Sequence, residues 1–563
     1  MNVTMPSTRA TPFAVAPSRR APAWGLWVAL VSSGLLHTLM ALRDRLIWGD
    51  EPIYLWLGQN WLHGRGFQLF GFNDVHHSPG YPFLPAVVSL LTGDAAVAST
   101  LLYAVFGTLL VLPVYGLARE LYDRRVAGWA ALIVGLLPAF IVAIPVWGSM
   151  TEPPYLFLVA GALYLTLRAL QGGRGWNYGL AGLALGLAYL IRPEAIWYFI
   201  ILGFLLVVVP WIVRRRSWGW LGSLALYGAG FLVSFAPYAY YTYLHTGAWL
   251  VSEKVGVTFA HALYLAKNDG VGADRLLWGL DSTGTRVLFY SDESYHMQTG
   301  MVQMIQDDPW GFLKHLYRNV RTLSEKLFTL QLFPAFLVPL TVLGLFRAPW
   351  DRVRLRGEIL LLAALLPPLT FLVFFVLERY YIPLLIPLGI WAGKGLDELG
   401  DWLAETWHQA RGRALSDRAN GLARGALVAL AALTLVALQP RGLVEASRVR
   451  SFRPEHKTVG LWLRDHTPAD ARIMARYPAI AYHANRPWVP SPHAELDQVI
   501  RYMQAQKADY WVIDGWELDW RPELAFLAEG PTLPDMELVY FSQDGPAPLL
   551  VYRTRPPCGC SKL

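Results

Sequence analysis

Cysteine is almost absent from this chain of 563 residues. The two that occur, Cys558 and Cys560, stand two positions apart near the end of the sequence. That spacing is too tight for an easy disulfide, and a metal site would need further ligands. Disulfide bonds therefore do not hold the protein together, and we expect the last residues to form an unstructured tail.

Charge is also scarce. Only 16% of the residues are charged and 54% are apolar, whereas soluble domains carry roughly 25% charged residues. The deficit is concentrated in apolar runs of about 20 residues, which is the length needed to cross a bilayer. We predict eleven membrane-spanning helices, at residues 24–42, 96–118, 127–147, 153–170, 176–191, 195–213, 219–243, 328–346, 358–377, 380–396 and 425–440.

The distribution of arginine and lysine predicts the orientation. Residues 1–22 contain no acidic side chain and are rich in Ser, Thr, Pro and Arg, so they should form a flexible tail. With this tail inside the cell, the inner loops carry most of the basic residues, as the positive-inside rule requires. The net charge of +7 then reflects inner loops rather than a nucleic-acid surface. Residues 23–440 would form a multi-pass domain of the plasma membrane, and the C-terminal segment would lie outside.

Three stretches are long enough to have structure on the outer face. The loop 43–95 should contain a short helix, 51–63, lying along the membrane with its apolar side. The loop 244–327 ends in an amphipathic helix that Asp308 caps. The segment 441–563 alternates helix and strand patterns, which predicts an extracytoplasmic α/β domain.

Ionisable residues recur just after the odd-numbered spans, all on the predicted outer face. Such groups at membrane depth are candidates for function. Each also has a structural alternative, as a helix cap, an ion pair or an arginine reaching the headgroups. Their convergence on one face favours a shared site. They are Asp50 and Glu51 after the first span, Glu152 after the third, Arg192 and Glu194 after the fifth, and Glu378, Arg379 and Tyr380 after the ninth.

A lipid-linked sugar phosphate would explain this mixture of side chains. Arginine offers a planar, permanently charged fork for phosphate oxygens. A carboxylate can take the proton of a hydroxyl or amide acceptor as the sugar carbon is attacked. The first outer loop has no Asp-x-Asp pair, so a metal-assisted donor site has little support. No metal or other cofactor is predicted.

The first outer loop also carries two short motifs, Trp48-Gly-Asp50-Glu51-Pro-Ile-Tyr54 and His77-Ser-Pro-Gly-Tyr81. The loop resembles that of GT-C glycosyltransferases that use polyprenyl-phosphate sugars, with the closest likeness to the bacterial protein O-mannosyltransferase and aminoarabinose-transferase branch. The resemblance implies a GT-C fold in which Asp50 is the base and Glu51 completes the catalytic pair. It also implies that Arg379 holds the donor phosphate.

We place the remaining candidates around these residues. Arg192 and His77 join Arg379 at the donor phosphate, although the aminoarabinose transferases have a lysine where this chain has His77. The side chains expected at the substrate are Glu152, Glu194, Glu378, Tyr380 and Tyr81.

Three functions compete. The leading one is inverting transfer of a sugar from a polyprenyl-phosphate donor to a protein, lipid or glycan acceptor at the outer face. The alternative is a flippase or transporter of a lipid-linked glycan, but the chain lacks the internal repeat that many transporters have. A non-catalytic assembly protein would leave the acids of the first outer loop unexplained. We expect the segment 441–563 to shape acceptor access rather than chemistry.

Overall fold

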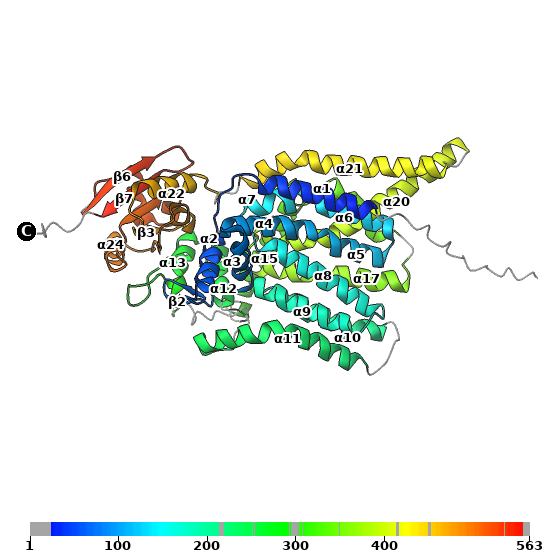
Figure 1. The fold of residues 1–563 in the computed structure, drawn as a ribbon, viewed down its shortest axis with the longest axis horizontal. Helices are drawn as coiled ribbons and strands as arrows, with labels where there is room; N and C mark the ends of the chain where they lie inside the picture. The colour runs from blue at the N-terminus through cyan, green and yellow to red at the C-terminus, as the bar shows by residue number, and fades with distance from the viewer. Residues whose placement is uncertain are drawn as a thin grey trace, which may run out of the picture.

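A helical bundle carries a small α/β domain at one of its ends (Figure 1). The structure is a computed structural model. The predicted tail 1–22 and both cysteines lie outside the residues that it describes. The described residues are 24–554 apart from 213–218, 250–251, 253, 292, 294–301, 303–304, 307, 348–349, 413–415, 449–451 and 534.

Each predicted span corresponds to a helix or to consecutive helical segments of the bundle. In the described part of the chain, seven helices are long and apolar enough to cross a membrane, so the protein is a multi-pass membrane protein. The bundle consists of α1 (Trp24–Ala41), α4 (Ala95–Leu109) with α5 (Val111–Leu121), α6 (Arg124–Leu136) with η1 (Ala139–Ala143) and α7 (Ile144–Val146), α8 (Glu152–Leu170), α9 (Trp176–Ile191), α10 (Ala195–Ile212), α11 (Gly219–Thr246), α16 (Leu337–Phe346), α17 (Arg352–Ala363) with α18 (Leu366–Leu369) and η4 (Thr370–Val373), α19 (Glu378–Tyr381) with η5 (Ile382–Leu384) and α20 (Leu385–Arg411), and α21 (Asp417–Ala446).

Two of the late spans differ from the apolar pattern. In the run 328–346 only Leu337–Phe346 is helical, and Pro334 lies in the irregular stretch before it. Helix α20 extends well past the predicted end at residue 396 because its polar second half finds partners. The carboxylate of Asp397 lies 2.7 Å from Arg125 and 3.3 Å from Arg424. Apolar content alone therefore underestimates the length of this helix.

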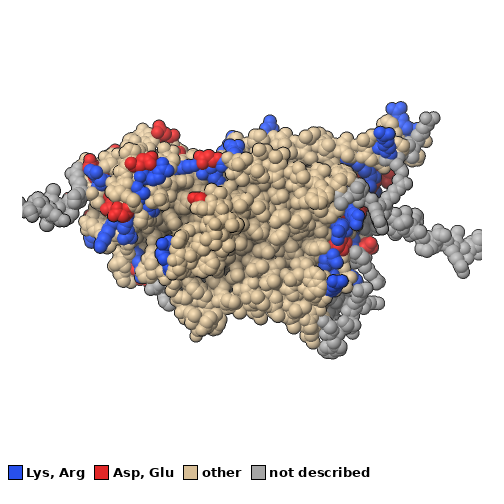
Figure 2. Space-filling view, in the orientation of Figure 1, with Lys and Arg blue, Asp and Glu red and all other residues tan. Residues whose placement is uncertain are grey.

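Buried hydrogen bonds clamp the end of the bundle that is remote from the α/β domain. The fully buried carboxylate of Glu358 accepts hydrogen bonds from the Tyr122 hydroxyl at 2.6 Å and the Trp391 indole at 2.7 Å. Arg354 adds a third bond at 3.0 Å. Lysine and arginine side chains gather at this remote end, and few charged side chains lie on the broad belt between the two ends (Figure 2).

Two long loops lie at the end that bears the α/β domain, which we call the domain-side end (Figure 1). In the second loop, Asp308 accepts a hydrogen bond from the Gly311 amide and so caps its helix, as predicted. The first long loop, residues 43–95, contains α2 (Glu51–Leu62), β1 (Gln68–Leu69), β2 (Phe72–Asn73) and α3 (Gly80–Thr92). The described parts of the second long loop, residues 244–327, include α12 (Lys254–Ala266), α13 (Gly270–Trp278), η2 (Leu288–Tyr290) and α15 (Pro309–Leu327).

The α/β domain, residues 452–554, contains one five-stranded sheet in the order β4-β3-β5-β7-β6. Strands β4, β3 and β5 are parallel to one another, and β7 pairs antiparallel with both β5 and β6. The domain starts a few residues later than the predicted boundary at 441, because α21 continues to Ala446. Its elements are α22 (Glu455–His466), β3 (Ile473–Ala475), α23 (Pro478–Ala484), β4 (Trp488–Pro490), α24 (Leu496–Ala505), β5 (Tyr510–Asp514), η6 (Glu517–Trp520), η7 (Pro522–Glu529), β6 (Met536–Ser542) and β7 (Leu549–Thr554).

Helix α2 packs on the α/β domain, whereas we expected its apolar side to lie on the membrane. Ile53 and Leu57 are buried in one hydrophobic cluster with Val459 and Leu463 of α22. Trp56 stacks on Trp488 of β4, with ring centroids 6.0 Å apart. An apolar helix face suits a lipid surface and a protein surface equally well, and here the protein covers it. The first long loop and the α/β domain therefore share a core.

Leu57→Ala should test this shared core. Leu57 is 0% exposed, and truncation of a buried leucine lowers the free energy of unfolding by about 2–5 kcal/mol. We expect a clear drop in the melting temperature of the detergent-solubilised protein. Leu91→Ala is the matched control, because Leu91 is 89% exposed. Equal melting temperatures for the two variants would contradict the packing described.

Candidate active site

Asp50 lies at the domain-side end of the bundle, immediately before α2. It occupies the N-cap position, but its side chain makes no capping hydrogen bond. The side chain is 40% exposed, and its carboxylate lies 3.8 Å from the guanidinium of Arg379. The helix-cap alternative is therefore not what the structure shows, and the carboxylate is available for chemistry.

The charge of Asp50 is stabilised from several sides. Partial burial by itself would raise the pKa of this carboxyl. The positive charge of Lys254 opposes that effect most strongly, and those of Arg379 and Arg192 add to it. Together they hold the pKa of Asp50 below its ordinary value of 3.8. The group is therefore ionised throughout the neutral range.

Arg379, in the short helix α19, has spare hydrogen-bonding capacity. Its Nε–H is buried and has no hydrogen-bond partner among the described residues. Its guanidinium lies 5.2 Å from the ring centroid of Tyr380, and that ring stacks on Phe371 with centroids 4.2 Å apart. A buried donor without an acceptor is costly unless a ligand supplies one. An anion beside Arg379 would do so.

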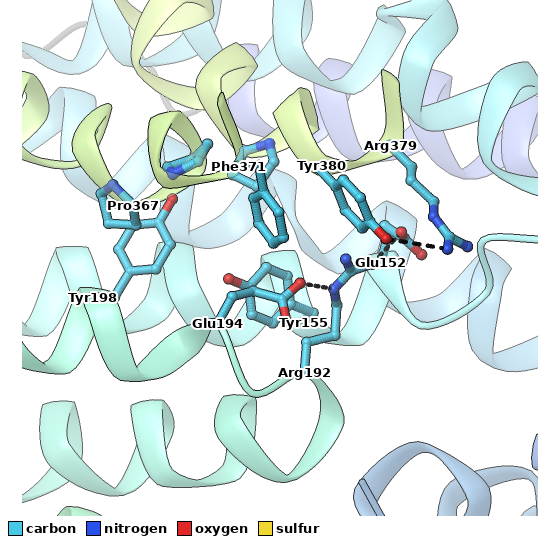
Figure 3. Close-up of a pocket in the computed structure, with 11 residues that line it drawn as sticks. Glu152, Tyr155, Arg192, Glu194, Tyr198, Pro367, Phe371, Arg379 and Tyr380 are labelled. Carbon is cyan, nitrogen blue, oxygen red and sulfur yellow. Dashed lines mark hydrogen bonds and ion pairs between the residues drawn. The ribbon is translucent and has the colours of Figure 1, made fainter. Parts of the chain in front are cut away.

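Arg192, by contrast, is already neutralised by carboxylates. It ends α9, and its guanidinium forms ion pairs with both Glu152 and Glu194. The hydroxyl of Thr151 donates a further hydrogen bond to Glu152 at 2.9 Å. Figure 3 shows Glu152, Arg192 and Glu194 lining one pocket together with Arg379 and Tyr380. The sequence-predicted residues that the structure brings together here are Asp50, Glu152, Arg192, Glu194, Arg379 and Tyr380.

Two residues near Asp50 were missed by the sequence reasoning. Lys254 begins α12 of the second long loop and belongs to no motif, so only the folded chain reveals its place. Tyr54 lies one helical turn after Asp50. Burial and the charge of Asp50 raise the pKa of its hydroxyl, and the charges of Arg379 and Arg192 oppose that rise. Residues four apart share a helix face, so this spacing could have identified Tyr54.

His77 lies beside Asp50 but is held by a different carboxylate. Asp74 accepts hydrogen bonds from its backbone amide at 2.8 Å and its ring Nδ1 at 3.0 Å. Burial and the nearby Lys254 lower the pKa of His77 in spite of Asp74 and Asp50. A neutral ring that donates from Nδ1 keeps only a lone pair on Nε2. The phosphate-binding role of His77 stays a prediction, and it requires the protonated ring.

Glu51 and Tyr81 belong to a separate buried cluster. Glu51 is 0% exposed, and both of its oxygens accept from Arg45, at 2.6 and 2.7 Å. Ser99 donates to the same carboxylate at 2.6 Å and lies 2.9 Å from the Tyr81 hydroxyl. This arrangement fixes the start of α2 and leaves neither side chain facing the pocket of Figure 3.

Glu378 is also turned to a partner outside the pocket, since it forms an ion pair with Lys326 of α15 at 2.8 Å. Among the described residues, no group of three or more His, Cys, Asp or Glu side chains is placed to hold a metal ion. The assembled chemistry is thus the ionised carboxylate of Asp50 beside two cations, Arg379 and Lys254. Among the described residues, neither cation has a carboxylate as close as those that hold Arg192. Such a site suits an anion together with a hydroxyl or amide group.

Comparisons with known proteins agree with this fold. The model of the family described as dolichyl-phosphate-mannose-protein mannosyltransferase matches residues 76–241 of the chain. Among curated proteins, none matches. The matched segment begins at the motif around His77 and includes Glu152 and Arg192.

Solved structures resemble most of the chain. The apo oligosaccharyltransferase of Archaeoglobus fulgidus has a TM-score of 0.56 and 16% identity, over 87% of this chain and 69% of its own. ArnT from Cupriavidus metallidurans, bound to undecaprenyl phosphate, has a TM-score of 0.53 and 15% identity, over 94% of this chain and 98% of its own. The Archaeoglobus fulgidus oligosaccharyltransferase AglB, in complex with an inhibitory peptide and a dolichol-phosphate, has a TM-score of 0.54 and 15% identity, over 96% of this chain and 75% of its own.

At these identities the likeness concerns the fold. The chain has the fold of the GT-C membrane enzymes, a helical membrane domain followed by a smaller domain with a sheet. The resemblance inferred from the motifs of the first loop is therefore confirmed. The protein is similar to this class of enzyme both in the segment that the family model matches and in its overall architecture.

Neutralising the two adjacent acids Asp50 and Glu51 should change the stability of the protein by very different amounts. Glu51→Gln leaves Arg45 buried without its ion pair, which typically costs about 3–5 kcal/mol of folding free energy. Asp50→Asn removes a partly exposed carboxylate that caps nothing, so the melting temperature should stay within a few degrees of the original. The measurement is thermal unfolding of both variants in the same detergent. A larger loss for Asp50→Asn than for Glu51→Gln would reverse our assignment of the two roles.

Proposed function

We propose that this protein is an integral-membrane glycosyltransferase that moves a sugar from a polyprenyl-phosphate donor to an acceptor at the membrane surface. One observation carries the proposal. At the domain-side end of a GT-C fold, the ionised carboxylate of Asp50 makes no helix-capping hydrogen bond and lies beside Arg379. The match of the mannosyltransferase family model supports it. So do the undecaprenyl phosphate bound by ArnT and the dolichol-phosphate bound by AglB.

The donor phosphate would take the positions that the protein leaves unsatisfied. Arg379 offers a buried Nε–H that has no hydrogen-bond partner in the described part of the chain, and the positive charge of Lys254 also acts on Asp50. Arg192 is engaged by Glu152 and Glu194, so its part is to stiffen the wall of the pocket and to support the anion from a distance. Phosphate is a strong hydrogen-bond acceptor, and a guanidinium matches its geometry.

The acceptor side would use Asp50 as the base. Its carboxylate takes the proton of the acceptor hydroxyl or amide, and the freed electron pair attacks the anomeric carbon of the sugar. The bond from that carbon to the phosphate oxygen breaks, and polyprenyl phosphate leaves with the electron pair. Attack opposite the leaving group inverts the anomeric configuration. Arg379 and Lys254 stabilise the charge that develops on the phosphate.

The distribution of charge supports an extracytoplasmic site. The end of the bundle remote from the α/β domain is rich in lysine and arginine (Figure 2), and cytoplasmic loops carry an excess of these residues. The site and the α/β domain would then face outward from the plasma membrane. There a lipid-linked donor lies at headgroup depth, and a protein, lipid or glycan acceptor approaches from outside.

Asp50→Asn should abolish most of the transfer. Loss of general-base help typically costs 10²–10⁴-fold in rate, so we expect turnover of a labelled polyprenyl-phosphate sugar to fall by about a hundredfold or more. The matched control is Asp94→Asn in the same loop. Asp94 caps α4 by accepting from the Val97 amide, and asparagine caps equally well. Near-normal transfer by the Asp50→Asn variant would contradict the assignment of Asp50 as the base.

The acid limb of the pH–rate profile should depend on Lys254. Asp50 must be ionised to act, and its pKa is held below 3.8, so kcat/KM should fall only as the pH drops through that low value. Lys254→Gln removes the strongest of the positive charges that depress this pKa. The pKa should rise, and the acid limb should move to higher pH. The matched control is Lys267→Gln, which removes an exposed charge in the same loop and should leave the acid limb in place. An acid limb that Lys254→Gln does not move would contradict the electrostatic account.

A further inference from the structure

A buried carboxylate of the second long loop makes several of the contacts between this loop and the α/β domain. Asp274, in α13, is 4% exposed. It lies 2.8 Å from Nδ1 of His493, accepts from Nε of Arg521 at 3.2 Å, and forms an ion pair with Arg476. Burial alone would raise the pKa of Asp274, but these three partners hold it well below its ordinary range. Asp274 is therefore a charged anchor.

The three partners of Asp274 come from one region of the sheet. Arg476 follows β3 directly, His493 follows β4, and Arg521 follows η6 after β5. The backbone amide of His493 also donates to the carbonyl of Trp278, the last residue of α13, at 2.7 Å. Helix α13 thus packs against the carboxyl ends of the parallel strands β4, β3 and β5.

The same loop reaches the candidate active site on either side of α13. Helix α12, which precedes α13, begins at Lys254, the cation that most strongly lowers the pKa of Asp50. After α13, the ring of Tyr290 in η2 lies edge-on to the ring of His76, with ring centroids 6.3 Å apart. The neighbouring Phe289 stacks on His76 with ring centroids 4.7 Å apart. Helix α13 is therefore the fixed point between two segments that meet the site.

We propose that Asp274 is a positioning residue for the active site. By fastening α13 to the α/β domain, it holds the two flanking segments, α12 with Lys254 and η2 with Phe289, at the site, and so sets the affinity of the site for a lipid phosphate. This inference rests on the proposed function. It assigns the α/β domain a part in building the donor site, beyond the part in acceptor access expected from the sequence.

The test is binding of undecaprenyl phosphate to the full-length protein in detergent. Asp274→Asn should raise the Kd about fivefold or more, the usual scale of coupling between distant sites. Asp274→Glu keeps the carboxylate and should restore most of the affinity. Asp269→Asn is the matched control, since Asp269 caps the same helix by accepting from the Gly272 amide, and it should leave the Kd unchanged.

A double-mutant cycle identifies the route of the effect. If Asp274 acts through Lys254, Asp274→Asn should add almost nothing to the loss caused by Lys254→Gln alone. Additive losses would overturn the proposal. Asp274→Asn leaves two buried guanidiniums without their carboxylate, so His493→Gln serves as a second variant, which keeps Arg476 and Arg521 paired with Asp274. Its smaller loss should likewise vanish in the Lys254→Gln background, and persistence there would also overturn the proposal.

Hydrogen exchange separates this proposal from the proposed function. In the protein without ligand, Asp274→Asn should speed amide exchange across α12, residues 254–266, while Asp269→Asn should not. Unchanged exchange in α12 would overturn the anchoring role whatever the protein binds. Faster exchange in α12, together with no binding of undecaprenyl phosphate by the unaltered protein, would support the anchoring role of Asp274. It would contradict the proposal that the donor is a polyprenyl phosphate.

Discussion

The negative charge of Asp50 is the constraint on which the rest of the arrangement depends. Partial loss of water raises the pKa of a carboxyl group, and nearby positive charge lowers it again. Here the compensation comes from Lys254, Arg379 and Arg192, which belong to three distant parts of the chain. The bundle, the second long loop and their mutual packing must all be correct before the site exists.

The pair Asp50-Glu51 illustrates how burial divides two adjacent acids. Asp50 is 40% exposed and makes one long ion pair with Arg379. Glu51 points into the protein, where Arg45 and Ser99 satisfy its oxygens. An ion pair of this kind offers no free oxygen to a substrate, but it holds the first turn of α2 in place. One acid is therefore equipped for chemistry, and its neighbour fixes the helix that presents it.

Much of the fold could be predicted because its signals are local. Apolar runs long enough to cross a bilayer predicted the spans, and the cap of α15 and the alternation of helix and strand in the α/β domain followed from residue patterns. The face of α2 was misassigned, since an apolar stripe does not say whether lipid or protein will cover it. Glu51 and Lys254 could not be placed in advance, because their surroundings come from residues far away in the sequence. Tyr54 could have been found from its four-residue spacing to Asp50.

The most direct test of the central claim is the fate of a synthetic polyprenyl-phosphate sugar incubated with the purified protein and a membrane fraction that supplies acceptor. The account predicts that free polyprenyl phosphate appears in step with a glycosylated acceptor, and that the new glycosidic bond has the inverted anomeric configuration. An intact donor that has only crossed the bilayer would contradict the account and favour a flippase. Retention of configuration would contradict the role given to Asp50.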